Sequence, residues 1–259
     1  MSPERAGRAR LNRCLVLCLG ALALLLAPAS ARAVVGGSED AGPLSRASVM
    51  VLSSRGGICS GVVLAPDVVL TAGHCASGAG QYRVHYRGPG GEPVLAEPAE
   101  IAVHQGYVRG AERSRRRSVD LALIRLSEPL PARFGAATLS AAIPPAGTAI
   151  TLGGYGIARE GDGRSSGTFR TAALTTIQPH GPGRILIWAK AIDGPAGACG
   201  GDSGGPIAGS GGAVVAITGW AGGGGKTRCG ELTQGTLVGP QRHWIDSILS
   251  RWGRQAAWR

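Results

Sequence analysis

Short apolar runs separated by glycine- and proline-rich turns cover most of the chain. Eight runs have the length and alternation of β-strands, at 47–52, 61–70, 82–86, 121–126, 148–152, 171–177, 185–189 and 213–218. Near the end, a helical spacing puts five apolar residues on one face: Trp244, Ile245, Ile248, Leu249 and Trp252. Short strands at regular spacing are typical of barrels or sandwiches. The pattern therefore predicts an all-β fold with one C-terminal helix at about 241–252.

The composition supports this prediction and excludes other classes. Of the 259 residues, 44 are glycine, and each glycine inside a helix costs about 1 kcal/mol relative to alanine. Charged residues make up 17% and hydrophobic residues 44%, which excludes a disordered polyelectrolyte and a multi-span membrane protein.

The first 33 residues have the layout of a secretory signal peptide. Arginines precede position 14, an apolar run covers 14–27, and the segment 28–33 is rich in small residues. Cleavage after position 29, 31 or 33 is compatible with the pattern, and the third choice leaves Val34 as the first residue. An uncleaved membrane anchor is less favoured because the run is short for a bilayer. We expect a secreted, extracellular protein of residues 34–259 that is not bound to a membrane.

Removal of this leader leaves four cysteines in an exported chain. They are Cys59, Cys75, Cys199 and Cys229. In an oxidising compartment they indicate two disulfides, and three pairings are open. None stands in a C-x-x-C pair, so no metal centre is predicted.

Three segments carry residues suited to nucleophilic catalysis. Residues 201–206 read Gly-Asp-Ser-Gly-Gly-Pro, residues 70–75 contain His74, and Asp120 begins a run of alternating apolar residues. A serine hydroxyl needs a base to become a nucleophile, and glycines bring backbone N–H groups close to a developing oxyanion. A lone histidine or aspartate is usually structural, so the combination of the three segments carries the signal.

Together with Val34-Val35-Gly36-Gly37, these segments resemble, in order, the four diagnostic segments of the chymotrypsin/trypsin-like serine proteases. The resemblance covers essentially all of residues 34–259. It implies two perpendicular six-stranded antiparallel barrels, at about 34–138 and about 139–243. His74 and Asp120 would come from the first barrel and Ser203 from the second.

The resemblance also implies the role of each residue. Ser203 would attack the scissile carbonyl, His74 would act as base and then acid, and Asp120 would hold the histidine in the right tautomer. The N–H groups of Gly201 and Ser203 would form the oxyanion hole.

Two further pairings follow from the same resemblance. The disulfides would be Cys59–Cys75 and Cys199–Cys229. The freed amine of Val34 would pair with Asp202. Because residues 31–33 are themselves a signal-peptidase frame, we expect export to produce this amine without a separate activating protease.

The pocket for the cleaved residue is expected to be neutral. Tryptic relatives carry an aspartate six residues before the serine, where this chain has Gly197, followed by Ala198. The segment Gly219-Trp220-Ala221 resembles the substrate-pairing strand, but Gly219 replaces the usual serine that binds the catalytic aspartate. We expect a preference for uncharged side chains, a glycine-rich pocket wall at 222–225, and activity reduced by Gly219.

Two other functions compete with this interpretation. A non-catalytic homologue could serve as a binding module, although such proteins typically lose a catalytic residue and this chain has all three. An α/β-hydrolase esterase would use Ser203, Glu231 and His243, but Gly204-Gly205-Pro206 is a poor start for the helix that must follow its serine.

The expected partners are a protein or peptide substrate and, as a second class, a protein inhibitor. We expect a monomer that needs no cofactor. Nucleic acid is not expected, because no recognition module accompanies the basic residues. The arginine-rich segment 109–117 is interpreted as a solvated loop in preference to a polyanion-binding patch.

Overall fold

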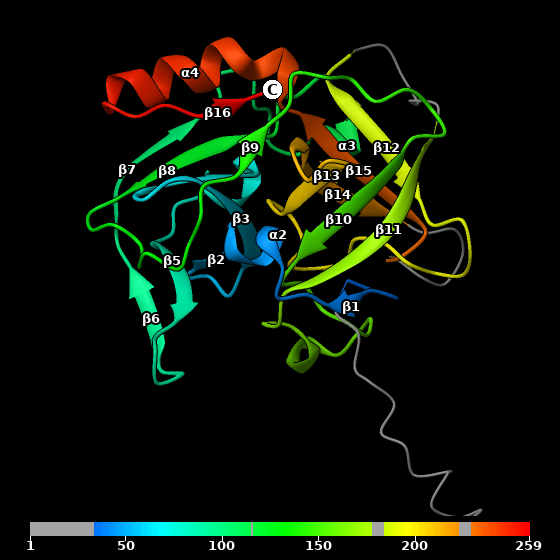
Figure 1. The fold of residues 1–259 in the computed structure, drawn as a ribbon, viewed down its shortest axis with the longest axis horizontal. Helices are drawn as coiled ribbons and strands as arrows, with labels where there is room; N and C mark the ends of the chain where they lie inside the picture. Colours follow the sequence, from blue (N-terminus) through cyan, green and yellow to red (C-terminus); the bar gives the residue numbers. More distant parts are fainter. Residues whose placement is uncertain (1–33, 115, 178–183, 223–228) are drawn as a thin grey trace, which may run out of the picture. The chain divides into compact units, whose positions relative to one another are not determined.

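The computed structural model describes residues 34–114, 116–177, 184–222 and 229–259 (Figure 1). The expected signal peptide and most of the glycine-rich segment 222–225 lie outside the described residues. Among the described residues, no helix is both long and apolar enough to cross a membrane.

The first sheet is an antiparallel set of seven strands that curls on itself. In chain order they are β2 (Ser48–Ser53), β3 (Ile58–Ala65), β4 (Val68–Thr71), β5 (Tyr82–Arg87), β6 (Pro93–Ala96), β7 (Pro98–Val103) and β8 (Ala122–Leu126). The pairing order is β6-β5-β2-β3-β4-β8-β7. Only Glu97 separates β6 from β7, which stand at the two ends of this order. No pairing between described strands closes the sheet, so it is a curled half-barrel, whereas a six-stranded barrel was expected here.

The second sheet contains a closed six-stranded barrel. Its strands are β10 (Ala149–Gly154), β11 (Arg170–Ile177), β12 (Leu186–Lys190), β13 (Pro206–Gly209), β14 (Val214–Gly222) and β15 (Leu232–Leu237). Their order is β13-β10-β11-β12-β15-β14, and β14 pairs back with β13 to close the ring. The short strands β9 (Thr138–Leu139) and β16 (Ala257–Trp258) add parallel pairs beside β14. The prediction of an all-β fold with a C-terminal helix is confirmed.

The beginning of the described chain joins the second sheet. Strand β1 (Ser38–Glu39) pairs with β11, and Val35 forms a bridge with Gly197. We had expected residues from 34 onward to belong to the first barrel, whereas the chain enters it only after α2 (Pro43–Arg46). The segment 34–39 is therefore placed beside the loops of the second barrel.

The C-terminal helix α4 (Arg242–Arg251) covers the first sheet. The ring of Trp244 lies 4.8 Å from that of His104, which follows β7, and the Arg254 guanidinium binds Asp67 between β3 and β4 at 2.7 and 2.9 Å. The five residues of the predicted apolar face are all buried. Figure 1 shows α4 running along β16 and above β7 and β8. The remaining short helices are η1 (Gly73–Cys75), α3 (Ala111–Ser114), η2 (Gly163–Ser165) and η3 (Gly239–Gln241).

Candidate active site

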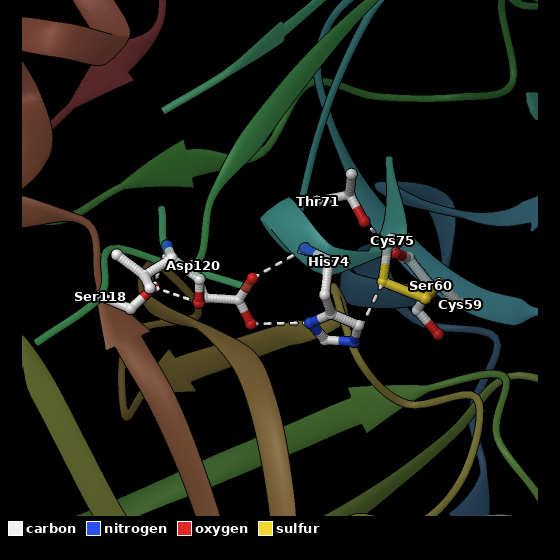
Figure 2. Close-up of polar contacts among 8 residues, drawn as sticks. Cys59, Ser60, Thr71, His74, Cys75, Ser118 and Asp120 are labelled. Atoms are coloured by element: carbon white, nitrogen blue, oxygen red, sulfur yellow. Dashed lines mark hydrogen bonds and ion pairs between the residues drawn. A yellow bond between two sulfur atoms is a disulfide. The ribbon is translucent and has the colours of Figure 1, made fainter. Parts of the chain in front are cut away.

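His74 and Asp120 are brought together by the pairing of β4 with β8. His74 lies in η1, directly after β4, and Asp120 lies two residues before β8, whose Ala122 faces Thr71. Asp120 accepts two hydrogen bonds from His74, one from the backbone N–H to Oδ1 at 2.8 Å and one from Nδ1 to Oδ2 at 2.7 Å (Figure 2). This arrangement fixes the imidazole with its Nδ1–H toward the carboxylate and leaves Nε2 as the basic nitrogen.

Both expected disulfides are present. Cys59 is bonded to Cys75, beside His74, and Cys199 is bonded to Cys229. The Cys75 sulfur lies 3.6 Å from Nε2 of His74, and Figure 2 draws this contact as a dashed line. Because both sulfurs of Cys59 and Cys75 are used in the disulfide, their grouping with His74 does not provide thiolate ligands for a metal.

The turn that carries Ser203 packs directly against the histidine segment. The Ser203 carbonyl accepts a hydrogen bond from Ser60 N at 2.7 Å. Gly204 has a φ of +84°, and a Cβ there would lie 2.2 Å from Thr71 Oγ1 and 3.2 Å from Ala72 N. Only glycine permits this backbone conformation and this approach. The serine is thereby held close to the segment that leads into His74.

The opposite side of the same turn is held close to Asp120. Gly204 N donates to Thr218 O at 2.7 Å, so Gly204 lies against β14. A Cβ on the next residue, Gly219, would lie 3.2 Å from Oδ2 of Asp120. Gly204 therefore contacts both the segment that leads into His74 and the strand β14 that passes Asp120.

Asp202 is buried beneath this turn and organises its backbone. Its Oδ1 accepts from Gly156 N at 2.8 Å and its Oδ2 from Cys199 N at 2.9 Å. Gly201 has a φ of +98°, and a Cβ there would meet Gly156 Cα at 2.8 Å. Within the described residues, the hydrogen bonds of the turn use the N–H groups of Asp202, Gly204 and Gly205, and none uses those of Gly201 or Ser203. Those two N–H groups are the expected oxyanion donors.

Burial raises the pKa of the Asp202 carboxyl to about 7. The N–H groups of Cys199 and Gly156 and the Arg170 guanidinium act in the lowering direction but do not offset the burial. Among the described residues, no cationic side chain forms an ion pair with it. A buried carboxylate of this kind favours the arrival of a positive group.

Val34 is docked beside the same region. Its side chain is completely buried, with Ala198 in the same core cluster. Gly197 N donates to Val35 O at 3.0 Å, and a Cβ on Gly36 would overlap with Pro195 O. The start of the expected mature chain therefore lies against the segment 195–198, which leads to Asp202.

The expected pocket residues lie close to a side chain that sequence analysis did not include. Gly197 and Ala198 face Thr233 of β15, whose Oγ1 accepts from Ala198 N at 3.0 Å. A Cβ on Gly197 would lie 3.0 Å from the same oxygen. Trp220 and Ala221 pair with Gln234 and Thr233. Position 197 is occupied by glycine, so it provides no acidic side chain to this wall.

Sequence analysis also did not identify Ser60 and Tyr155 as residues that position the serine turn. Ser60 Oγ donates to Gly201 O at 2.9 Å and accepts from Tyr155 N at 2.9 Å, which ties the serine turn to both sheets. Neither residue stands in a segment that resembles a catalytic motif, and only the preceding Cys59 was predicted to lie near the site.

The esterase alternative is wrong for this fold, since β13 follows Ser203 where a helix would be required.

Comparison with known proteins agrees with this geometry. The family model described as Trypsin matches residues 34–245. Trypsin iota of Drosophila melanogaster is 30% identical over 205 residues, which cover 72% of this chain and 77% of that protein. Brachyurin of Leptuca pugilator is 29% identical over 167 residues, covering 58% of this chain and 70% of that protein.

Solved structures share the fold at low sequence identity. Neuropsin, a serine protease from mouse brain, superposes with a TM-score of 0.70 at 22% identity, covering 83% of this chain and 99% of that one. Human heparin binding protein gives 0.69 at 21% identity, covering 86% of this chain and all of that one. The chain belongs to the trypsin family of serine endopeptidases.

Proposed function

We propose that the protein is an exported endopeptidase that cleaves peptide bonds with the triad Ser203, His74 and Asp120. The observation that carries this proposal is the position of Gly204. Its contacts to Thr71 on one side and to Thr218 on the other hold the neighbouring serine close to the segments that carry the histidine and contact the aspartate. Thr71 lies three residues before His74, and Thr218 precedes Gly219, whose Cβ would lie 3.2 Å from Asp120, so these contacts support the proposal.

The residues have separate roles in the proposed reaction. Nε2 of His74 takes the proton of Ser203 as the hydroxyl attacks the carbonyl, and later returns a proton to the leaving amine. Asp120 holds the ring through Nδ1 and stabilises the imidazolium that forms. The N–H groups of Gly201 and Ser203 receive the negative charge on the substrate oxygen, and each such donor contributes about 3–4 kcal/mol in related proteases.

The cleaved residue is proposed to be small and uncharged. Without a carboxylate at position 197, the pocket has no partner for the charge of arginine or lysine. The buried Thr233 side chain, hydrogen-bonded to Ala198, occupies space beside Gly197. These two features favour short, uncharged side chains over long cationic ones.

Export is proposed to activate the enzyme. In the full-length chain Val34 has a φ of +49°, which a β-branched residue rarely adopts. Cleavage of the bond before Val34 removes this constraint and creates an amine next to the segment that leads to Asp202. The buried carboxylate then gains a cationic partner, and the serine turn gains a fixed anchor.

The decisive experiment is intact mass spectrometry of the secreted protein before and after reaction with a fluorophosphonate probe. We expect a starting mass for residues 34–259 with two disulfides, followed by one adduct on Ser203 and none on the Ser203→Ala variant. A correctly processed protein that takes no adduct would instead favour the binding-module alternative. A chain beginning at Ser30 or Arg32 would show that a second protease completes activation.

A further inference from the structure

A cavity lined by arginines and aromatic rings lies outside the residues that the proposed catalysis uses. It has a volume of about 240 Å³. We name it the arginine pocket and define it by six of its lining residues: Arg46, His85, Tyr86, Arg87, Arg133 and Phe134. These come from α2, β5 and the loop before β9, and the second barrel contributes Tyr155 to the lining.

The cations of the arginine pocket are not neutralised by acidic side chains of the described residues. Arg46 and Arg87 each donate to a backbone carbonyl, of Ala41 and Gly91 respectively, both at 3.1 Å, and Arg133 donates to the carbonyl of Arg87. None of the three forms an ion pair in the described part of the chain, whereas other arginines, such as Arg83 and Arg254, bind carboxylates. A carbonyl satisfies part of a guanidinium and leaves its charge and other N–H groups available.

The pocket also presents ordered aromatic surface. The Arg133 guanidinium lies 4.7 Å from the centroid of the Phe134 ring and 5.6 Å from that of Tyr86. The two rings meet edge to face, 5.4 Å apart. Stacking on the rings pre-orders the Arg133 side chain, so less rotational freedom is lost when it binds an anion.

We propose that the arginine pocket is a docking site for an acidic segment of a polypeptide, in which carboxylate side chains flank an apolar or aromatic one. The carboxylates would bind Arg46, Arg87 and Arg133, and the apolar side chain would contact Tyr86 and Phe134. The small, ring-lined cavity suits single side chains, whereas a sulfated polysaccharide needs an extended track of cations. The proposal rests on the proposed function, since it names an acidic segment as part of the preferred protein substrate.

The position of Tyr155 gives the site a short connection to the serine turn. Its N–H donates to Ser60 Oγ, and Ser60 Oγ donates to the carbonyl of Gly201. The next residue, Gly156, donates to Asp202. Two hydrogen bonds, through Ser60, therefore connect Tyr155 of the arginine pocket to Gly201 of the serine turn.

The first test measures binding by calorimetry in the Ser203→Ala background, where the probe cannot be cleaved. The probe is the acetylated, amidated peptide Glu-Phe-Glu-Glu-Phe-Glu, and its control has every Glu replaced by Gln. We expect binding of the acidic peptide only, weakened about tenfold (about 1.4 kcal/mol) by Arg133→Gln. The matched control Arg184→Gln removes an equal charge from an exposed residue before β12 and should leave the affinity unchanged. Equal weakening by both variants would overturn the proposal in favour of non-specific attraction to the net charge.

Two further outcomes separate the possibilities. If a heparin tetrasaccharide binds more tightly than the peptide and loses its affinity with Arg133→Gln, the occupant is a sulfated glycan and the peptide proposal is wrong.

A second experiment uses the active enzyme and compares two substrates that have the same cleavage sequence, one with an acidic tail and one without. Arg133→Gln should raise KM for the tailed substrate alone and leave kcat unchanged, whereas a change with both substrates would indicate a structural role. The calorimetry does not depend on catalysis, so failure of fluorophosphonate labelling and failure of docking remain distinguishable.

Discussion

Asp120 accepts two hydrogen bonds from His74, through the N–H and the Nδ1–H, and the resemblance to the family implies a third donor at position 219. Position 219 is occupied by glycine, which has no side chain to donate. A Cβ on Gly219 would lie 3.2 Å from Oδ2 of Asp120, so a side chain at this position would point to the carboxylate. The hydroxyl of a serine at position 219, one bond beyond this Cβ, can rotate toward Oδ2 and donate a hydrogen bond to it.

Replacement of Gly219 by serine should therefore increase activity. We expect Gly219→Ser to raise kcat about three- to tenfold, since a hydrogen bond to a charged group contributes about 1 kcal/mol or more. Gly219→Ala is the matched control, because it introduces the same Cβ without a donor. It should give no increase, and steady-state kinetics on one peptide substrate would measure both. An equal gain from alanine would assign the effect to backbone rigidity.

At the scale of elements, the strand pattern was largely predictable and the pocket was not. The apolar runs 82–86, 121–126 and 171–177 correspond closely to β5, β8 and β11. The run 61–70 was one prediction but is two strands, β3 and β4, because Pro66 and Asp67 turn the chain. Strand β15 was missed because its residues Thr233, Gln234, Gly235 and Thr236 show no apolar alternation. Its backbone hydrogen bonds with β12 and β14 hold it in the sheet despite this composition.

The missed strand carries a testable determinant of specificity. Thr233→Gly removes the side chain beside Gly197 and should enlarge the pocket. We expect the ratio of kcat/KM for phenylalanine over alanine at the cleaved position to rise at least tenfold, since one methylene's worth of space contributes about 1–3 kcal/mol. Thr233→Ser retains the hydroxyl and should keep most of the original preference. An unchanged ratio in the glycine variant would place the pocket elsewhere.

At the scale of the whole molecule, the proposed catalytic residues were identified from four short segments that are far apart in the sequence. Their chemistry was readable from sequence, because serine, histidine and aspartate each stand in a distinctive segment. Their mutual placement was not, because it depends on contacts of Gly204 with both sheets and of Val34 with the segment 195–198. Composition likewise gave no indication of the arginine pocket, whose residues are far apart in the sequence.

Processing should change how the stability of the whole molecule depends on pH. With residues before Val34 retained, burial raises the pKa of Asp202 to about 7, so between about pH 4 and 7 the folded chain binds more protons than the unfolded chain. Its free energy of unfolding should therefore fall as the pH rises through this window. In the chain that begins at Val34, the amine lowers that pKa, and the decline should be reduced or reversed.

Denaturant titrations at several pH values on the two forms would measure this difference. Asp202→Asn provides the control in the form that retains the residues before Val34, because an amide does not titrate and the decline between about pH 4 and 7 should disappear. Parallel curves for the two forms of the unmodified sequence would argue against an ion pair between Val34 and Asp202.

The position of α4 has a consequence for the order in which the molecule can form. Trp244, Ile245, Ile248, Leu249 and Trp252 share a core cluster with β3, β4 and β8, although they follow both barrels in the sequence. The N-terminal barrel, synthesised first, thus has an incomplete apolar interior until the last segment emerges. Chain elongation, at about 5–20 residues per second, leaves that interior exposed for seconds. Under the export proposed above, the nascent chain would leave the cytoplasm before its first domain is complete, in an unfolded state that can cross a membrane.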